Sequence, residues 1–223
     1  MKKILYFLLA LLPLVGFTAC DDNIAETDND EFSHDWVNRN AKFFDEHMAD
    51  AKKAIADAQN TYGQDWENHC DWRIYRSFAK MPGGVTADSI CVKITERGTG
   101  SGYPLYTDSV RVNYIGRLIP TENYPDGRVF DHSGLYEDED YVFSPEFCSP
   151  TSLLVSSLIE GFTTALMEMR IGDRWRVYMP QELGYMSASA GLIPPYSALT
   201  FDIQLKGFYR KGESTTKYVS EGV

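Results

Sequence analysis

The stretch SLIEGFTTALMEMRIGDRWRVYM, residues 157–179, combines a helical pattern with a strand pattern. Its first part predicts a helix, because apolar residues recur there at the three- and four-residue steps of one helix face: Leu158, Phe162, Leu166 and Met169. Ser157 is a favoured N-cap residue, so the predicted helix begins there and closes before Gly172. The second part predicts a strand, because every second residue is apolar: Trp175, Val177 and Met179.

The same alternation predicts strands on both sides of this helix. Every second residue is apolar in three further runs: Ile90, Val92 and Ile94; Val110, Val112 and Tyr114; Leu199, Phe201, Ile203 and Leu205. Because one short amphipathic helix accompanies several strands, the sequence predicts an α+β fold in which the helix covers one face of an antiparallel sheet. The predicted domain spans residues 71–210, and a polar tail follows over residues 211–223.

A longer apolar stripe precedes the strands. It predicts a helix over residues 33–63, because its members lie three or four residues apart: Val37, Ala41, Phe44, Met48, Ala51, Ile55 and Ala58. Such a stripe must be covered either by the rest of the same chain or by a second copy of it. The Ala-rich turns would make a thin coiled-coil seam, so the sequence favours packing on the same domain, and a monomer over a dimer.

The start of the chain has the features of an export signal. Met1-Lys2-Lys3 is a charged opening, an apolar stretch follows, and Thr18-Ala19 places small residues directly before Cys20. A cysteine at this point is typical of bacterial lipoproteins, so residues 1–19 are predicted to be a lipoprotein signal peptide and Cys20 the lipidated residue. An ordinary export signal, with Cys20 there by chance, is the alternative. The polar, acidic residues 20–32 are predicted to be a tether.

The charge and the cysteines narrow the classes of partner. The formal net charge is −11 at pH 7, which argues against nucleic acid, because phosphate backbones are bound through clustered Lys and Arg. Beyond Cys20 the chain has Cys70, Cys91 and Cys148, so at most one internal disulfide can form, and its pairing stays open. The spacing of cysteines and histidines matches no metal site, and we expect neither a metal nor a cofactor.

Several separated blocks follow one another in a defined order: VRVNYIG (110–116), VFD (129–131), LIEGF (158–162), MRIG (169–172), GY (184–185), LIPP (192–195) and LTFDIQL (199–205). In this order the blocks resemble FKBP-type peptidyl-prolyl cis-trans isomerases, most closely over residues 108–209. Together with Cys20, the resemblance indicates an exported bacterial lipoprotein of the Bacteroidetes type. The FKBP fold, an antiparallel sheet wrapped over one short helix, is here expected to be preceded by the N-terminal helix.

The resemblance implies an aromatic pocket that binds proline-containing polypeptides. It implies catalytic roles for four residues, with the Ile159 backbone N–H and the Tyr185 hydroxyl as hydrogen-bond donors: Phe130, Asp131, Ile159 and Tyr185. The substrate-binding residues that it implies are Tyr114, Leu158, Phe162, Ile193 and Phe201, with Tyr141 and Phe143 as a further wall. Met186 is a departure, because it stands where the family has Gly after this Tyr.

The implied reaction is rotation about X-Pro bonds in exported or unfolded polypeptides. That rotation breaks amide resonance, a barrier of about 18 to 20 kcal/mol, and a dry apolar pocket lowers the barrier by favouring the twisted, less hydrated imide. The resemblance also implies chaperone activity and a macrolide of the FK506 type as a ligand. A non-catalytic peptide-binding scaffold with the FKBP fold is the alternative function.

The lipoprotein signal implies a location in the cell envelope. We expect attachment to a membrane through the lipid on Cys20, with the outer membrane as the expected one. Asp21 and Asp22, directly after the lipidated cysteine, leave both the periplasm and the cell surface open.

Overall fold

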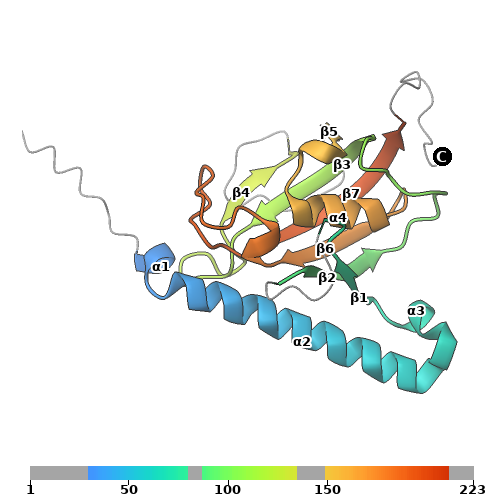
Figure 1. The fold of residues 1–223 in the computed structure, drawn as a ribbon, viewed down its shortest axis with the longest axis horizontal. Helices are drawn as coiled ribbons and strands as arrows, with labels where there is room; N and C mark the ends of the chain where they lie inside the picture. The colour runs from blue at the N-terminus through green and yellow to red at the C-terminus, as the bar shows by residue number, and fades with distance from the viewer. Residues whose placement is uncertain (1–29, 80–86, 135–148, 211–223) are drawn as a thin grey trace, which may run out of the picture.

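The computed structural model describes residues 30–79, 87–134 and 149–210, which form a seven-stranded antiparallel sheet with helices on both of its faces (Figure 1). The strand order is β1-β2-β6-β7-β3-β4, and β5 also pairs with β3. This arrangement confirms the predicted α+β class. The strands are β1 Trp72–Arg76, β2 Ser89–Glu96, β3 Ser109–Arg117, β4 Val129–His132, β5 Thr151–Leu154, β6 Arg174–Met179 and β7 Leu199–Tyr209. The helices are α1 Asp30–Ser33, α2 Trp36–Tyr62, α3 Trp66–His69 and α4 Glu160–Glu168, with 3-10 turns η1 Gly63–Asp65, η2 Val155–Ser157 and η3 Gln181–Leu183.

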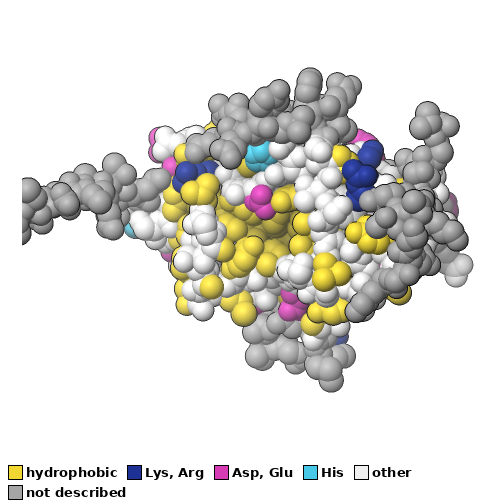
Figure 2. Space-filling model, turned by 90° about the horizontal axis from the view of Figure 1, so that it is seen from above, with side chains coloured by type: hydrophobic (Ala, Val, Ile, Leu, Met, Phe, Trp, Pro, Cys, Tyr) yellow, Lys and Arg dark blue, Asp and Glu magenta, His cyan; other side chains and the backbone are white. Residues whose placement is uncertain are grey.

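Strand β7 lies between β6 and β3 in the middle of the sheet. Leu199, Phe201 and Ile203 alternate along it toward the face that α4 covers, and there they join Phe162 and Leu166 of the helix in one buried core. Burial of each such side chain stabilises the fold by about 1.5 to 3 kcal/mol. Helix α4 has nine residues and leaves part of this face uncovered. Figure 2 shows a hollow in the molecular surface where hydrophobic side chains gather.

Helix α4 begins at Glu160, two residues later than the predicted start after an N-cap at Ser157. Ser157 is not its N-cap: it ends η2, and its Oγ donates a hydrogen bond back to the Leu154 carbonyl at 2.7 Å. Ile159 is the N-cap instead, with an extended backbone, and its carbonyl accepts from the Thr163 N–H at 3.0 Å. The prediction was wrong because the Ser157 hydroxyl is used by the turn before the helix, a local bond that competes with capping.

Helix α2 buries a face that differs at its first turns from the predicted stripe. Val37 is 49% exposed and Ala41 is also exposed, whereas Trp36 and Asn40 point inward together with Phe44, Ala51 and Ala58. The indole of Trp36 is a larger apolar group than the Val37 side chain, so burying it rotates the start of the helix by about one position. Gly63 follows the helix with φ 57° and ψ −123°, a backbone conformation with positive φ that glycine adopts without a steric penalty.

The sheet face opposite to α4 carries α2. Val177 pairs with Phe201 on the α4 side, so its neighbour Tyr178 points to the other side. There the Tyr178 ring contacts Phe43 and His47 of α2, with ring centroids 6.1 Å and 4.0 Å apart. Part of the apolar face of α2 is therefore covered by the same chain. The monomeric state itself stays a prediction.

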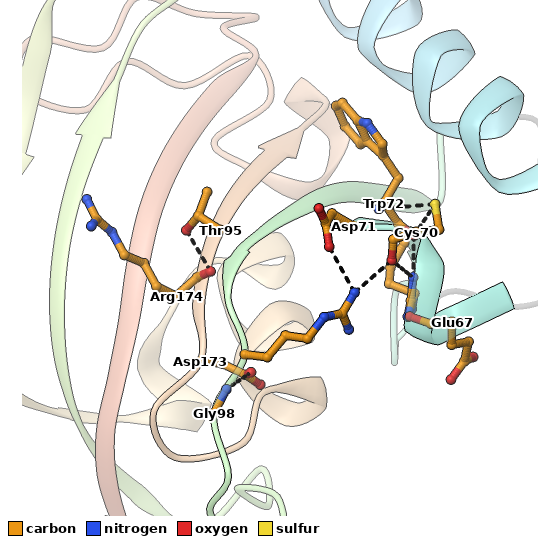
Figure 3. A network of polar contacts seen from close by, with 10 residues as sticks. Glu67, Cys70, Asp71, Trp72, Thr95, Gly98, Asp173 and Arg174 are labelled. Atoms are coloured by element: carbon orange, nitrogen blue, oxygen red, sulfur yellow. Dashed lines mark hydrogen bonds and ion pairs between the residues drawn. The ribbon is translucent and has the colours of Figure 1, made fainter. Parts of the chain in front are cut away.

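Hydrogen bonds from two arginines, Arg73 and Arg97, join the end of α3 to β1 and to the residue after β2. Figure 3 shows the surrounding polar network, with Glu67, Cys70, Asp71 and Trp72 labelled. The Arg73 guanidinium donates to the carbonyls of Glu67, Cys70 and Trp72 at 2.7 to 2.9 Å, and it lies over the Trp66 ring at 4.6 Å. Arg97, after β2, donates to the same Cys70 carbonyl at 2.8 Å. Because α3 has four residues, its last carbonyls lack helical partners, and Arg73 satisfies them.

The described cysteines are buried free thiols, Cys70 and Cys91, so no disulfide joins these two. Burial raises the pKa of Cys91 to about 12, which keeps this thiol protonated at neutral pH. Cys148 and Cys20 lie outside the described residues. None of the helices in the described ranges is both long and apolar enough to cross a membrane.

We expect Arg73→Ala to lower the free energy of unfolding by on the order of 2 to 3 kcal/mol. The substitution removes the charged donor, so the carbonyls that accept its hydrogen bonds are left without a partner. Arg73 is 7% exposed, whereas the side chain of Arg97, which shares one acceptor, is 44% exposed. Arg97→Ala is the matched control and should cost less than about 1 kcal/mol. Urea denaturation measures both variants, and equal losses would contradict the capping role of Arg73.

Candidate functional site

A cavity of about 470 Å³ opens beside the start of α4. It is lined by residues of β3, β4, β5 and β7, of η2 and the start of α4, and of the loop before β7: Tyr114, Phe130, Asp131, Leu153, Ser157, Leu158, Ile159, Phe162, Tyr185, Ala190, Gly191, Leu192, Ile193 and Phe201. Asp131 is the one charged residue among these lining residues. The cavity is therefore apolar, with few polar groups to orient a ligand.

A β-bulge places two consecutive residues of β4 in the cavity. Strand β4 pairs with β3 through Asp131 opposite Gly116 and Val129 opposite Arg117, so Phe130 is the extra residue between the two pairs. In a regular strand, neighbouring side chains point to opposite faces, and a bulge interrupts this alternation. The bulge explains how both Phe130 and Asp131 line the cavity.

Four aromatic rings form the wall of the cavity around Phe201. Its ring lies 5.0 Å from Phe162 at 88° and 5.4 Å from Phe130 at 85°, both edge to face. Tyr114 lies 5.9 Å from Phe162 and 6.5 Å from Phe201. Edge-to-face pairs contribute about 0.5 to 1.5 kcal/mol beyond their buried area, so these rings hold one another in place.

Gly116 makes room for this wall. A Cβ at Gly116 would lie 2.6 Å from two atoms of the Phe130 ring and 2.7 Å from Cε1 of Phe201. Carbon atoms that are not bonded to each other pack at about 3.5 to 4.0 Å, so any side chain here would displace both rings.

The polar edge of the cavity consists of a carboxylate and two phenols. The Tyr114 hydroxyl donates to Oδ2 of Asp131 at 2.8 Å, and Asp131 is exposed to solvent. Burial, and then the hydrogen bond with Asp131, raises the pKa of Tyr114 above its ordinary value. Burial and the charge of Asp131 raise the pKa of Tyr185 in the same direction. Both hydroxyls therefore stay protonated at neutral pH, and both tyrosines line the cavity.

The extended backbone at the N-cap of α4 offers a further donor. Ile159 lines the cavity, and no acceptor for its backbone N–H is found among the described residues. Two hydrogen bonds hold the start of α4 in place. Thr163 Oγ1 donates to the Val155 carbonyl at 2.9 Å, and the Ser77 hydroxyl donates to the Glu160 carboxylate. The helix start is thus fixed relative to the cavity, with an amide available to a bound carbonyl.

The loop 185–196, which we call the flap, forms the remaining side of the cavity. Ala190 and Ile193 exchange backbone hydrogen bonds of 3.1 and 2.9 Å, and the Tyr196 N–H donates to the Met186 carbonyl at 2.6 Å. Met186 has φ 52°, a left-handed conformation that glycine adopts without strain. A glycine, which the resemblance implied at this position, would adopt this conformation without strain, and Met186 adopts it here.

The structure brings nine of the predicted site residues together around the cavity: Tyr114, Phe130, Asp131, Leu158, Ile159, Phe162, Tyr185, Ile193 and Phe201. Their individual roles stay predictions. Tyr141, Phe143 and the predicted lipidation site Cys20 lie outside the described residues. Five lining residues were not predicted: Leu153, Ser157, Ala190, Gly191 and Leu192. Leu192 lies beside Ile193 in the LIPP block, and that adjacency was the available signal.

Among the described residues, no group of three or more His, Cys, Asp or Glu side chains is arranged to hold a metal ion.

The segment that forms the cavity is similar to known proteins. Residues 103–206 match the family model described as FKBP-type peptidyl-prolyl cis-trans isomerase, a range that overlaps the predicted 108–209. A macrophage infectivity potentiator from Trypanosoma cruzi is 36% identical over 138 residues, which are 61% of this chain and 59% of that protein. The FKBP-type 22 kDa peptidyl-prolyl cis-trans isomerase of Escherichia coli is 36% identical over 121 residues, or 54% of this chain and 50% of that protein.

A third relative, named outer membrane protein MIP, from Legionella longbeachae, is 36% identical over 126 residues, 56% of this chain and 46% of its own length. The chain thus spans about half the length of these relatives. Among solved structures, FkpA from Escherichia coli has a TM-score of 0.45 at 25% identity, covering 81% of this chain and 78% of that one. A peptidyl-prolyl cis-trans isomerase from Pseudomonas syringae has a TM-score of 0.44 at 24% identity, covering 74% and 96%. Residues 103–206, which include all the residues that line the cavity, are thus similar to the FKBP-type peptidyl-prolyl cis-trans isomerase family.

Proposed function

We propose that this protein catalyses cis-trans rotation about X-Pro bonds in exported polypeptides. The observation that carries the proposal is the apolar cavity with a wall of four aromatic rings and hydrogen-bond donors at its edge. Its volume of about 470 Å³ is in the range of small-ligand sites. The flat rings offer the proline ring an apolar surface that excludes water.

In this proposal, catalysis results from desolvation and orientation. The planar imide is more polar and more strongly hydrated than the twisted one, so transfer into the apolar cavity favours the twisted state. Phe162, which is 3% exposed, forms the floor under the proline ring, and Phe130 and Phe201 form the side wall. No residue has to act as a nucleophile or exchange a proton with the substrate.

Two donors orient the peptide in the same proposal. The Ile159 N–H binds a substrate carbonyl from the helix side, and the Tyr185 hydroxyl binds one from the flap side. Asp131 accepts the hydrogen bond from the Tyr114 hydroxyl and so holds the Tyr114 ring in place, while the charge of Asp131 lies at the edge of the cavity. Asp131 therefore acts partly by positioning Tyr114.

The competing function is a scaffold that binds proline-containing peptides without turnover. A protease-coupled isomerisation assay on the chain lacking residues 1–20 separates the two. We expect the rate of X-Pro rotation to rise with enzyme concentration. Binding of a proline-containing peptide or of an FK506-type macrolide, without a rate above the uncatalysed background, would leave the scaffold function in place of the enzyme.

Chaperone activity is part of the proposal, because large apolar side chains surround the mouth of the cavity. Leu154, Tyr185, Met186 and Leu192 are exposed by 37% to 56% and lie on it or next to lining residues. Exposed apolar surface of this kind marks binding sites for other chains. Suppression of aggregation of an unfolded test protein measures this activity, and no suppression at equimolar concentration would argue against it.

We further propose that the mature chain is attached to a membrane of the cell envelope through lipid on Cys20. The support is the charged, apolar and small-residue order of residues 1–19, together with a relative that is named an outer membrane protein. The protein is proposed to act as a monomer, because α2 packs on its own domain. Sedimentation of the form lacking residues 1–20 at micromolar concentration tests this, and a stable dimer would contradict it.

We expect Tyr185→Phe and Asp131→Ala each to lower kcat/KM by about 2- to 12-fold, which corresponds to the roughly 0.5 to 1.5 kcal/mol of one hydrogen bond. Asp131→Asn should retain more activity than Asp131→Ala, because an amide oxygen can still accept the Tyr114 hydroxyl. The coupled assay measures all three variants. A loss of about 100-fold or more in any of them would contradict catalysis by desolvation and indicate proton transfer.

Replacement of the proposed lipidation site gives a second test. We expect Cys20→Ser to move the protein from the membrane fraction to the soluble fraction, because the thiol that carries the lipid is lost. Fractionation followed by immunodetection measures the shift, with Cys91→Ser as a control that should stay with the membrane. A Cys20→Ser protein that remains membrane-bound would rule out the lipid anchor.

A further inference from the structure

Helix α2 reaches across to the end of the flap through buried polar contacts. Oδ1 of Asn40 accepts the Ala198 N–H at 2.8 Å, and the Trp36 indole N–H donates to the Ser197 hydroxyl at 3.1 Å. Ser197 in turn donates to the Pro194 carbonyl within the flap at 2.7 Å. In Figure 1 the first turns of α2 run beside the loop that leads into β7.

Asn40 is an unusual residue for the buried side of a helix. It is 1% exposed, and burying an amide side chain is costly unless its polar atoms are satisfied. The two polar atoms of the Asn40 side chain each have a partner here: Oδ1 accepts from Ala198, and Nδ2 donates to the Trp36 carbonyl at 2.7 Å. Without Asn40 the buried Ala198 N–H, which precedes the first residue of β7, would lose its acceptor.

The segment that α2 holds belongs to the cavity. Five lining residues come from the flap: Tyr185, Ala190, Gly191, Leu192 and Ile193. The flap closes on itself through the bond from Tyr196 to Met186, and Ser197 and Ala198 connect that closure to the sheet. Contacts at Ser197 and Ala198 therefore set where Tyr185 and Ile193 stand relative to the aromatic wall.

We propose that α2 is a clamp on the flap, with Asn40 and Trp36 as positioning residues for the cavity. The inference rests on the proposed function for its effect on catalysis, but not for its effect on the flap. Neither residue lines the cavity, so both act through Ser197 and Ala198. The N-terminal helix thereby positions one side of the cavity rather than acting as a spacer.

Hydrogen–deuterium exchange of the full chain without any ligand tests the clamp directly. In Asn40→Ala we expect the amides of residues 185–196 to exchange about 2- to 12-fold faster, since one buried hydrogen bond that resists local opening is lost. Trp36→Phe keeps an aromatic side chain but removes the indole N–H that donates to Ser197, together with part of the buried ring, so it should also speed exchange in the same segment. It also serves as the test if Asn40→Ala does not fold.

Ala51→Gly is the matched control, because Ala51 is buried in the same helix and the substitution weakens the helix without touching the flap. It should leave exchange of residues 185–196 unchanged. In the isomerisation assay, Asn40→Ala should raise KM about 2- to 12-fold with kcat retained, as expected when only the binding geometry is lost. Equal flap exchange in Asn40→Ala and the unsubstituted chain would overturn the clamp, even if the enzyme is active. Faster exchange in a protein without isomerase activity would instead overturn the proposed function and keep the clamp.

Discussion

The aromatic wall of the cavity depends on the absence of a side chain at Gly116. This residue lies on the central strand β3, opposite Phe201 of β7 on one side and opposite Asp131 of β4 on the other. The rings of Phe201 and of the bulged Phe130 occupy the volume that a Cβ would take. The two rings thus pack directly against the backbone of Gly116, and in that position Phe201 makes edge-to-face contacts with Phe130 and Phe162.

The two faces of the sheet carry different parts of the molecule. One face carries α4, the core and the cavity, while the other is covered in part by α2 through Tyr178, Phe43 and His47. At the edge where β7 begins, α2 contacts the residues that end the flap. A helix on the back of the sheet therefore influences the cavity on the front, through a short path of hydrogen bonds rather than through the sheet.

Much of the fold and of the cavity could be predicted from the sequence. Apolar residues alternate with period two along the strands, and the sequence blocks that line the cavity follow one another in a recognisable order. Three features could not be predicted. The bulge at Phe130 depends on pairing between strands, the start of α4 depends on a bond that Ser157 makes backward, and the burial of Trp36 and Asn40 depends on partners about 160 residues away. Each is set by tertiary contacts that a local pattern does not contain.

The most direct test of the account is the isomerase activity of Gly116→Ala. One added methyl group must push the rings of Phe130 and Phe201 toward the cavity, at an overpacking cost of about 1 to 3 kcal/mol. When this free energy is lost from binding of the transition state in the cavity, kcat/KM should drop by roughly 5- to 150-fold in a protein whose circular dichroism shows an intact fold. A folded Gly116→Ala protein with unchanged kcat/KM would contradict the claim that this aromatic wall carries the activity.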